Sequence, residues 1–586
     1  MNWPDVTGKV IALDTETTGL TDKDRPVGAS LSYDDQDCYF AWGHPEQNSC
    51  SLTEFKAWAN DAVKRAEVVV MHNGPFDMRM LSYVDVDPLH WPVEDTGTVC
   101  ALLNELEPSF ELDKLSLKYT GKSKSDDELN QWCADHFGGA ATRNAQAKNY
   151  HRAPGRIVAP YAKGDSRMTL DLYKARRPLL KDEGLESVYA LELLQLPIVL
   201  KMHRVGVRID QRQAVALRDD LLRKHTVLDR WLEHMAPGVN FNSTPQLAAL
   251  FDTLGIPYLY TEAGNPSITK ELLNELAATG KYEFPSKLVE YRQLKHYANT
   301  FIQSYLLDNI RDTGTVHGEF HPIKRDKYGT VSGRYSSGGG LNLQNIPARD
   351  PFWAPMIRGL YIPYSPDHDW DRYDYSQIEY RYLAHYAGGK LRQAYQGNPD
   401  IDFHQMVSDM SGMDRKPAKN LNFAVVYGQG VNATMAQLGG LSREKTLEFL
   451  RQYHSAVPEA KRLMNRAMNV AAQRGYIITW GGRRRRFRKK DSGGYQSLHK
   501  ALNALLQGSA ADLMKKAMVA VDEVIDWQDA ILHLTVHDEL DLSITRGETG
   551  DTYRRQIKEA MEDFDLSVPI KAVHERGTDW GHVVEA

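Results

Sequence analysis

The segment from Leu532 to Ile544 alternates apolar and polar residues on either side of a short acidic step. Apolar residues occupy positions 532, 534 and 536 and then 540, 542 and 544, with His537-Asp538 between the two runs. A period of two predicts strands, and a two-residue break predicts a tight turn, so a β-hairpin is expected here. Its tip would present Asp538 and Glu539 to a metal ion or a phosphate. Taken alone, the segment is better explained as a plain surface turn, because Asp is common in turns.

Length and composition bound the remaining choices. A chain of 586 residues exceeds one hydrophobic core, so about two to four domains are expected. The net charge of −6 does not indicate a nucleic-acid binder, which makes the position of the basic residues decisive. Four cysteines form no CxxC pair, which indicates thiols of a reducing compartment without disulfides or zinc. Neither a signal peptide nor an apolar run of about 18 residues is found, so we expect a cytoplasmic protein.

Three separated segments of the first third carry acidic residues. Asp14 and Glu16 follow the apolar run Val10–Leu13, and on a strand they point to the same side. Asp77 opens a helical pattern after a second apolar run, and Tyr161 and Asp165 are four residues apart, on one helix face. Carboxylates brought together repel, and a divalent metal with a preference for oxygen ligands removes that conflict.

This set resembles the tyrosine-containing DEDD 3′–5′ exonucleases: DTE, then an Asn and an Asp four apart in HNGPFD, then YAKGD. The resemblance implies an active nuclease in which Asp14, Glu16, Asp77 and Asp165 bind two metal ions. Tyr161 would orient the attacking water. The alternative is a decayed domain with a purely structural role, which the complete set of carboxylates argues against.

The second half holds a further acidic strand end and a helix with a mixed cationic and aromatic face. Asp374 ends a short strand, ahead of a helix that starts near Ser376, and it could share metal ions with Asp538. Residues four apart drift slowly around a helix, so the four side chains of one such series share a face. Two cations suit a triphosphate, and two aromatic rings suit a base. The series is Arg415, Lys419, Phe423 and Tyr427.

Two stretches are candidates for DNA contact. Residues 331–347 are rich in Gly, Ser and Asn, which predicts a loop; it carries Arg334, Gln344 and Asn345, whose side chains can read the acceptors of the minor groove. A flexible linker is the alternative. The run GGRRRRFRKK, residues 481–490, is the strongest basic segment. We expect it to contact template or primer phosphates rather than to form only a solvated charged loop.

The motifs SGRYSS with NLQNIP, DYSQIEYR, RKPAKNLNFAVVYG, NALLQGSAADL and VHDE occur in the order and at the spacing of the family A DNA polymerases. With the exonuclease motifs the resemblance covers nearly the whole chain. It implies metal ligands at Asp374, Tyr375 and Asp538, with Glu539 nearby and Lys419 as a proton donor to pyrophosphate. It implies nucleotide contacts by Arg415, Lys419, Phe423, Tyr427, Glu379, His404 and Gln377, with Glu379 blocking a ribose 2′-OH. It implies DNA contacts by Arg334, Gln344, Asn345, Asn503, Gln507 and His537.

The same resemblance implies an α/β multidomain fold, with a ribonuclease H-like exonuclease domain followed by a right-hand polymerase. The expected boundaries are 1–185 for the exonuclease domain, 186–320 for the thumb, 321–395 and 495–586 for two parts of the palm, and 396–494 for the fingers. Two Mg²⁺ ions per active site are expected, with Mn²⁺ as a substitute. Primer-template DNA and dNTPs are the expected partners, together with a phage helicase-primase and a single-stranded DNA-binding protein.

Three details refine this expectation. Phe423 resembles the members that reject dideoxynucleotides, and His499 stands where the family often has Arg, which puts that DNA contact in doubt. The stretch from Asn240 to Leu306 is too compact for a thioredoxin-binding insertion, so a phage replicative enzyme without that loop is expected. Two rival functions remain: a single-subunit RNA polymerase, against which Glu379 argues, and an exonuclease whose polymerase half only binds DNA.

Overall fold

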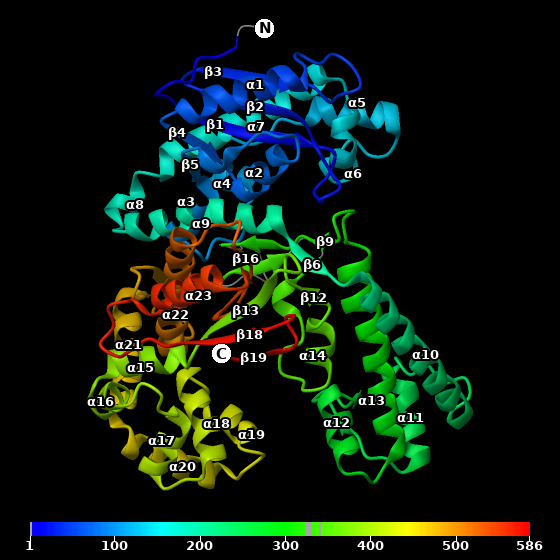
Figure 1. Cartoon of the computed structure of the whole chain (residues 1–586), viewed down its shortest axis with the longest axis vertical. Coiled ribbons are helices and arrows are strands. Elements are labelled where there is room, and N and C mark those ends of the chain that lie inside the picture. The colour runs from blue at the N-terminus through cyan, green and yellow to red at the C-terminus, as the bar shows by residue number, and fades with distance from the viewer. Residues whose placement is uncertain (1–2, 323–330, 339–340) are drawn as a thin grey trace.

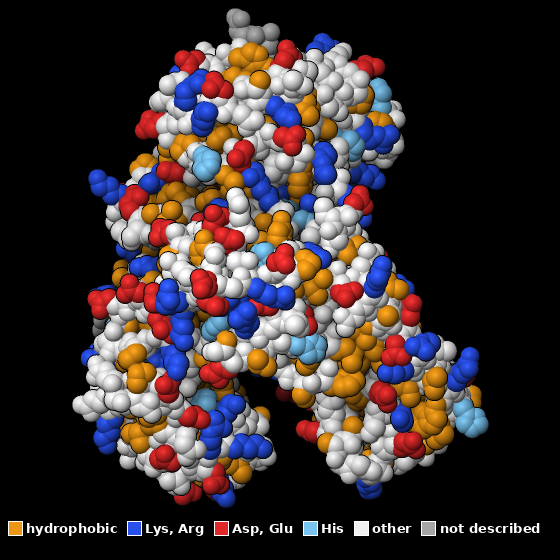
Figure 2. Space-filling model, in the orientation of Figure 1, with side chains coloured by type: hydrophobic (Ala, Val, Ile, Leu, Met, Phe, Trp, Pro, Cys, Tyr) orange, Lys and Arg blue, Asp and Glu red, His pale blue; other side chains and the backbone are white. Residues whose placement is uncertain are grey.

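The computed structural model describes residues 3–322, 331–338 and 341–586. An N-terminal α/β unit sits above a second sheet, which two helical arms flank (Figure 1). The space-filling view shows the molecule hollowed between the ends of these arms (Figure 2). Figure 1 therefore divides the chain into a compact upper unit and an open lower half.

The N-terminal sheet has the strand order β3-β2-β1-β4-β5, in which β3, β2 and β1 are antiparallel and β4 and β5 run parallel to β1. This is the ribonuclease H-like arrangement that the sequence predicts. Strand β2 is buried along its whole length, and the long helix α7 packs across β1, β2 and β3. The strands are β1 (Val10–Thr17), β2 (Pro26–Tyr33), β3 (Gln36–Ala41), β4 (Val68–Met71) and β5 (Val93–Asp95).

Helices surround this sheet and connect it to the rest of the chain. A reciprocal capping box between Ser51 and Glu54 begins α1, and prolines near the first turn begin others. The helices are α1 (Leu52–Ala62), α2 (Gly74–Ser82), α3 (Thr96–Leu103), α4 (Leu112–Thr120), α5 (Asp127–Phe137), α6 (Arg143–Gln146), α7 (Gly155–Arg176), α8 (Leu179–Asp182) and α9 (Glu186–Val205).

Helix α9 belongs to two hydrophobic cores at once. Leu196 and Leu200 pack into the core of the N-terminal sheet, whereas Val199 and Met202 pack into the large core of the second half. Because the two sets lie on different faces of the helix, α9 fixes the N-terminal unit directly onto the second half. It also packs along α22 (Ala501–Val524).

The second sheet is antiparallel, with the order β16-β17-β13-β18-β19. Its centre is β13, which ends in the segment predicted to carry Asp374. The predicted hairpin is present, because β16 and β17 pair across a two-residue turn at His537-Asp538. The strands are β13 (His368–Tyr375), β16 (Ala530–Val536), β17 (Glu539–Thr545), β18 (Ala572–Gly577) and β19 (Val583–Glu585), with α23 (Glu548–Glu562) packed on β17 and β18.

One helical arm lies in the chain between β6 and β9, two strands of a small sheet of order β12-β6-β9. The apolar spacing of Leu288–Leu306 predicts a single α-helix, but the α-helix ends at His296 and continues as a π-helical segment, Tyr297–Leu307. The elements here are β6 (Val207–Ile209), α10 (Gln211–Met235), α11 (Thr244–Leu254), β7 (Leu259–Tyr260), β8 (Pro266–Ser267), α12 (Lys270–Ala278), α13 (Glu283–His296), β9 (Thr315–Val316), β10 (Glu319–His321), α14 (Trp353–Arg358) and β12 (Tyr361–Ile362).

The other arm lies between β13 and α22 in the chain. The stretch 331–347, which precedes β13, is not wholly the predicted loop. Within it β11 (Ser336–Gly338) pairs with β10, and a 3-10 turn covers Leu343–Asn345. Residues 339–340 of that stretch lie outside the described residues. The arm comprises α15 (Ile378–Ala387), α16 (Gly389–Gly397), α17 (Phe403–Ser411), α18 (Arg415–Val426), α19 (Val431–Gln437), α20 (Arg443–Ala456), α21 (Pro458–Arg474), β14 (Tyr476–Ile478) and β15 (Arg484–Arg486). Within the described ranges, no helix combines the length and the apolar character needed to cross a membrane.

Gly428 allows α18 to end against the segment that begins α22. Its φ is +61°, and a Cβ there would lie 2.1 Å from the backbone oxygen of His499. The left-handed backbone alone costs an L-residue about 1–2 kcal/mol, and the clash adds to it. We therefore predict that Gly428→Ala lowers the melting temperature and slows primer extension. Gly430→Ala, where a Cβ meets nothing within 4 Å, is the matched control and should change neither measurement.

Candidate active sites

The acidic residues of the first third meet at the end of β1. One carboxylate oxygen from each of Asp14, Glu16 and Asp165 lies within 4.8 Å of the others. Strand periodicity places the first two side by side, and α7 brings the third. Burial and the neighbouring Asp77 and Asp165 raise the pKa of Asp14 well above its usual range, and burial with Asp165 raises the pKa of Glu16 to about 8. The three groups therefore favour a shared cation.

Asp77 joins this site from the first turns of α2. Its Oδ1 accepts hydrogen bonds from the Thr15 backbone N at 3.0 Å and from Thr15 Oγ1 at 2.7 Å. Thr15 lies between Asp14 and Glu16 on β1, and its side chain points to the other side of the strand. Its two hydrogen bonds to Asp77 hold α2 against the end of β1. Burial raises the pKa of Asp77 to about 7. Three of the four predicted carboxylates thus lie together with Asp77 beside Asp14, and their joint binding of metal stays a prediction.

Two cations at this site escaped the sequence analysis. Lys124 Nζ forms an ion pair with Asp165 and lies 3.3 Å from the hydroxyl of Tyr161, and Arg143 Nη2 lies 3.5 Å from the same hydroxyl. Both come from loops or short helices outside the acidic motifs, and no periodicity marks them. Burial and the nearby Glu16 raise the pKa of Tyr161 well above its usual range, so its hydroxyl stays protonated.

The hairpin tip of the second sheet faces the end of β13. Asp374 is the cross-strand partner of Glu539, and the Tyr375 backbone N donates to the Asp538 carbonyl oxygen at 3.1 Å. His537 adopts φ +58°, a left-handed conformation that is uncommon outside glycine but that histidine adopts more often than most residues, and it tightens the turn. Burial, Glu539 and Asp538 raise the pKa of Asp374 to about 7. The predicted meeting of Asp374 with the hairpin is present.

Arginines hold the remaining carboxylates of this second site. Arg334 Nη2 lies 2.9 Å from Glu379 Oε1 and 3.4 Å from Asp538 Oδ1, so it connects α15 with the hairpin tip. Glu539 Oε1 instead lies 3.3 Å from Arg358 Nη1 and 3.2 Å from the indole N of Trp580. Glu539 is thus restrained by structural partners that Asp538 lacks.

Helix α18 presents the predicted cationic and aromatic face. Lys419 is exposed and has no ion pair among the described residues, whereas Arg415 pairs with Asp402 at 2.6 Å. The ring of Phe423 stacks on that of Tyr427, with centroids 6.2 Å apart. The opposite face, which includes Ala418, Leu421 and Val425, is buried. The four-residue spacing therefore marked the outward face correctly.

His404 on α17 lies beside this face. Asn422 Nδ2 lies 2.9 Å from His404 Nδ1 and donates to it, so the neutral ring carries its proton on Nε2. Burial lowers the pKa of this histidine. Gln377, also predicted to bind nucleotide, uses its side chain to hold α16 and α17: its Oε1 accepts from Tyr395 and from the Phe403 backbone N.

The residues predicted to contact DNA lie on α22 and near the hairpin. Asn503 and Gln507 line a cleft of about 310 Å³, and the Asn503 Nδ2 is buried without a hydrogen-bond partner in the described structure. Gln344 Nε2 donates to the Thr535 carbonyl oxygen on β16 at 3.2 Å, while Asn345 is exposed. Asn503 and Gln507 thus line one wall of this cleft.

The basic run does not have the predicted arrangement. Its first four arginines, Arg483–Arg486, are ion-paired with carboxylates of the protein, and Arg483 is buried between Glu192 and Asp512. The expectation of DNA phosphate contact is therefore wrong for the buried Arg483, and for Arg484–Arg486, which pair with carboxylates of the protein, it stays a prediction. A one-dimensional charge run does not reveal acidic partners hundreds of residues away.

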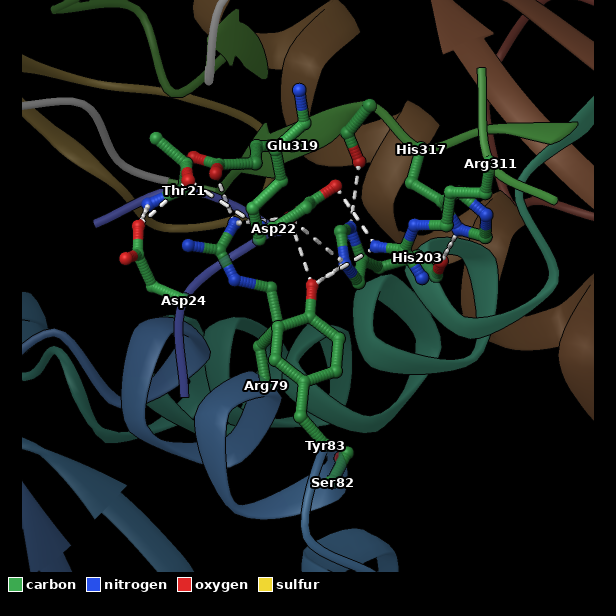
Figure 3. A network of polar contacts seen from close by, with 12 residues as sticks. Thr21, Asp22, Asp24, Arg79, Ser82, Tyr83, His203, Arg311, His317 and Glu319 are labelled. Atoms are coloured by element: carbon green, nitrogen blue, oxygen red, sulfur yellow. Dashed lines mark hydrogen bonds and ion pairs between the residues drawn. The ribbon is translucent and has the colours of Figure 1, made fainter. Parts of the chain in front are cut away.

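A second polar junction joins the N-terminal unit to the lower half (Figure 3). Asp22, in the loop after β1, pairs with Arg311 at 2.9 Å and accepts from the Tyr83 hydroxyl at 2.8 Å. Arg79 of α2 forms an ion pair with Glu319 of β10. Figure 3 shows these side chains converging between α2 and the segment that carries Arg311 and Glu319. The helix that carries Asp77 is thereby tied to the second half.

Comparisons with known proteins agree with this geometry. Residues 212–582 match the model of DNA polymerase family A, and residues 5–181 match a 3′–5′ exonuclease model. The DNA polymerase DpoZ of Salmonella phage PMBT28 is 31% identical, over 96% of this chain and 95% of that protein. DNA polymerase I of Pseudomonas aeruginosa is 28% identical over 98% of this chain, which spans 63% of that longer protein.

A solved structure supports the fold. The POL domain of Pol1 from M. smegmatis, in complex with DNA primer-template and dNTP, aligns with a TM-score of 0.81 at 23% identity, covering 99% of this chain and 97% of that one. Fold and sites together define a two-site enzyme of nucleotidyl transfer and nuclease chemistry. The chain belongs to DNA polymerase family A and is a DNA-directed DNA polymerase with a 3′–5′ exonuclease domain. Metal binding is typical of both families.

The raised carboxyl pKa values predict a pH-dependent response to Mg²⁺. Folded-state values near 7 to 8 for Glu16, Asp77 and Asp374 exceed the unfolded values, so the metal-free folded chain binds more protons. The contribution of these three groups to stability is therefore greatest below their unfolded pKa values and is lost as the pH rises through 7 to 8. Because a metal replaces those protons, Mg²⁺ should raise the melting temperature more at pH 8 than at pH 6. An equal rise at both values would contradict the assignment.

Proposed function

We propose that the chain extends a DNA primer at the site of Asp374 and Asp538 and removes mispaired primer ends at the site of Asp14, Glu16, Asp77 and Asp165. The observation that carries the proposal is the presence of two separate carboxylate groupings, one at the end of a strand in each sheet. Each contains groups whose pKa is raised by burial and by a neighbouring carboxylate. An assay of a labelled primer with dNTPs, with rNTPs and with no nucleotide tests the proposal. The primer should be extended with dNTPs only and shortened when no nucleotide is present.

Two Mg²⁺ ions per site fit the donor sets, because Mg²⁺ prefers oxygen ligands, and carboxylates lie together at the first site and neighbour one another at the second. At the first site Asp14, Glu16, Asp77 and Asp165 would hold them. At the second, Asp374, Asp538 and the Tyr375 backbone would do so. When bound, such ions activate an attacking oxygen and stabilise a leaving one. Tyr161, protonated and 3.3 Å from Lys124 Nζ, would orient the attacking water of the first site.

The triphosphate fits the cationic end of α18. Lys419 is exposed and unpaired within the described structure, so it is available to bind the phosphates and to give a proton to pyrophosphate. Arg415 would exchange its exposed partner Asp402 for phosphate oxygens. His404 offers a donor from Nε2, and Gln377 holds α16 and α17 in place beside it. Phe423 would pack on the incoming nucleotide, with Tyr427 near the templating base.

Residues around the hairpin would exclude ribonucleotides and bind the DNA. Glu379, held by Arg334 at 2.9 Å, would block a ribose 2′-OH. The primer end would be contacted by His537, with Arg334, Asn503 and Gln507 probing the minor groove, and Gln344 and Asn345 near the same end. Glu539 serves mainly as a support, because Arg358 and Trp580 already hold it.

The two helical arms and the sheet between them correspond to a polymerase hand. We assign residues 186–320 to the thumb, 321–395 and 495–586 to the palm, 396–494 to the fingers and 1–185 to the exonuclease domain. Similarity to phage polymerases supports a role in phage genome replication. We further propose that the enzyme acts in the host cytoplasm with a helicase-primase and a single-stranded DNA-binding protein.

Asp538→Ala should remove primer extension and leave excision intact, because the nuclease carboxylates belong to another sheet. The loss should exceed 100-fold in the extension rate, since a metal ligand at the reacting centre disappears. Excision of a mismatched end by the same preparation shows that the variant is folded. Extension within a few-fold of the parent enzyme would refute the assignment.

Asp14→Ala should have the reverse effect. A single-stranded or mismatched primer should no longer be shortened, while extension of a matched primer continues at the parent rate. Gel-resolved time courses on both substrates measure the two activities side by side. Excision by Asp14→Ala at the parent rate would contradict the nuclease assignment.

Phe423 predicts poor termination by dideoxynucleotides, as in the family members that carry Phe at this place. Phe423→Tyr should raise dideoxynucleotide incorporation relative to dNTP by at least tenfold, while dNTP incorporation changes little. Competitive incorporation of ddNTP and dNTP at one template base gives this ratio directly. Efficient termination by the parent enzyme would contradict the prediction.

A further inference from the structure

The hairpin of β14 and β15 carries three arginines that reach across to the exonuclease domain. Arg486 Nη1 lies 3.0 Å from Glu105 Oε2 and donates to the Leu102 carbonyl oxygen at 3.0 Å. Arg485 Nη1 lies 3.2 Å from the other oxygen of Glu105. Arg484 forms an ion pair with Glu183, just beyond α8. Both oxygens of Glu105 are therefore occupied by arginines that lie about 380 positions away in the sequence.

The adjoining Arg483 belongs to a different, buried cluster. Its guanidinium contacts Glu192 of α9 and Asp512 of α22, and Lys515 contacts Glu192 as well. These groups are almost wholly inaccessible, whereas Glu105 is 13% exposed and Glu183 is 41% exposed. The hairpin is thus rooted in the second half through Arg483 and reaches outward to the exonuclease domain through the next three residues.

The same contact borders the proposed DNA site. The cleft of about 310 Å³ is lined by Leu106 of the exonuclease domain, by Arg485 and Arg486, and by the α22 residues Asn503 and Gln507. Leu106 directly follows Glu105, so the exonuclease domain supplies one wall of the cleft and the second half supplies the other. The ion pairs of Glu105 hold the two walls together. A shift of either domain would change the cleft.

We propose that Glu105, Glu183 and Arg484–Arg486 form an interdomain clasp that fixes the exonuclease site relative to the polymerase site, so that a primer end passes between the two within one complex. The proposal rests on the proposed two-site function. The clasp acts on position alone, because none of its residues lies in either carboxylate grouping.

The domains have other attachments that survive loss of the clasp. Helix α9 contributes to both hydrophobic cores, and the junction of Asp22, Arg79, Arg311 and Glu319 joins them independently (Figure 3). Removing the clasp should therefore loosen the relative orientation of the domains without unfolding either one. Transfer of the primer would suffer, whereas the chemistry at each site would not.

The test measures transfer in a single binding event. The full chain is bound to a primer-template with a mismatched 3′ end, and the reaction is started with Mg²⁺, dNTPs and excess unlabelled trap DNA. The parent enzyme should excise and then extend before it dissociates. Glu105→Arg should lower the fraction excised and extended in one event at least fivefold, while extension of a matched primer and excision of a single strand, without trap, stay within twofold.

Three further variants make the outcome decisive. Glu105→Arg combined with Arg486→Glu restores opposite charges and should recover most of the transfer. Glu111→Arg, an exposed acid with no ion pair within the described part of the chain, should have no effect. Glu105→Gln keeps the shape and should give an intermediate loss, even if the reversal of charge harms folding.

Transfer by Glu105→Arg and Glu105→Gln at the parent level would overturn the clasp, and so would equal losses for Glu111→Arg or a failure of the charge swap to rescue. The assays without trap measure polymerisation and excision directly. Failure of the proposed two-site function would appear there for the parent enzyme, and failure of the clasp would appear only in the trapped reaction.

Discussion

Repulsion between buried carboxylates is the constraint on which both active sites depend. Asp14 and Glu16 lie side by side on one strand, and Asp374 lies close to Asp538, so each site has a raised pKa and an unfavourable charge when deprotonated. Such groups stay together only where the surrounding fold dictates their position. Extended strands do so, because alternation fixes the side to which each residue points and register fixes its partner.

The fold supplies this rigidity differently at the two sites. In the exonuclease domain, Thr15 ties α2 to β1 through Asp77, and Lys124 offsets part of the negative charge at Asp165. In the polymerase half, the hairpin brings Asp538 to the end of β13, and Arg334 compensates it from a neighbouring loop. Helix α9 then packs into the hydrophobic cores of both halves. The distance between the two sites is therefore fixed by core packing.

Local patterns in the sequence predicted what depends on local geometry. The period of two at the hairpin, the pair on β1, the four-residue spacing of Tyr161 and Asp165, and the outward face of α18 all have the predicted placement. Contacts between distant segments could not be predicted in this way. Lys124 and Arg143 lie outside any motif, and the π-helical continuation after His296 follows from packing rather than from apolar spacing.

The basic run shows this limit most clearly. Four adjacent arginines are typical of phosphate contact, yet Arg483–Arg486 face carboxylates supplied by residues 105, 183, 192 and 512. Two of those residues, Glu105 and Glu183, belong to the other domain. Only the tertiary structure shows that these arginines form ion pairs within the protein, and that some of the pairs join the exonuclease domain to the polymerase half.

Proton release on metal binding tests the central claim most directly. Titration of the enzyme with Mg²⁺ at pH 7, by calorimetry in two buffers of different ionisation enthalpy, counts the protons released for each ion bound. If buried carboxylates hold protons in place of metal, the parent enzyme releases protons, and the combined variant Asp14→Asn with Asp374→Asn releases fewer. Binding that is independent of the buffer in the parent enzyme would contradict the account.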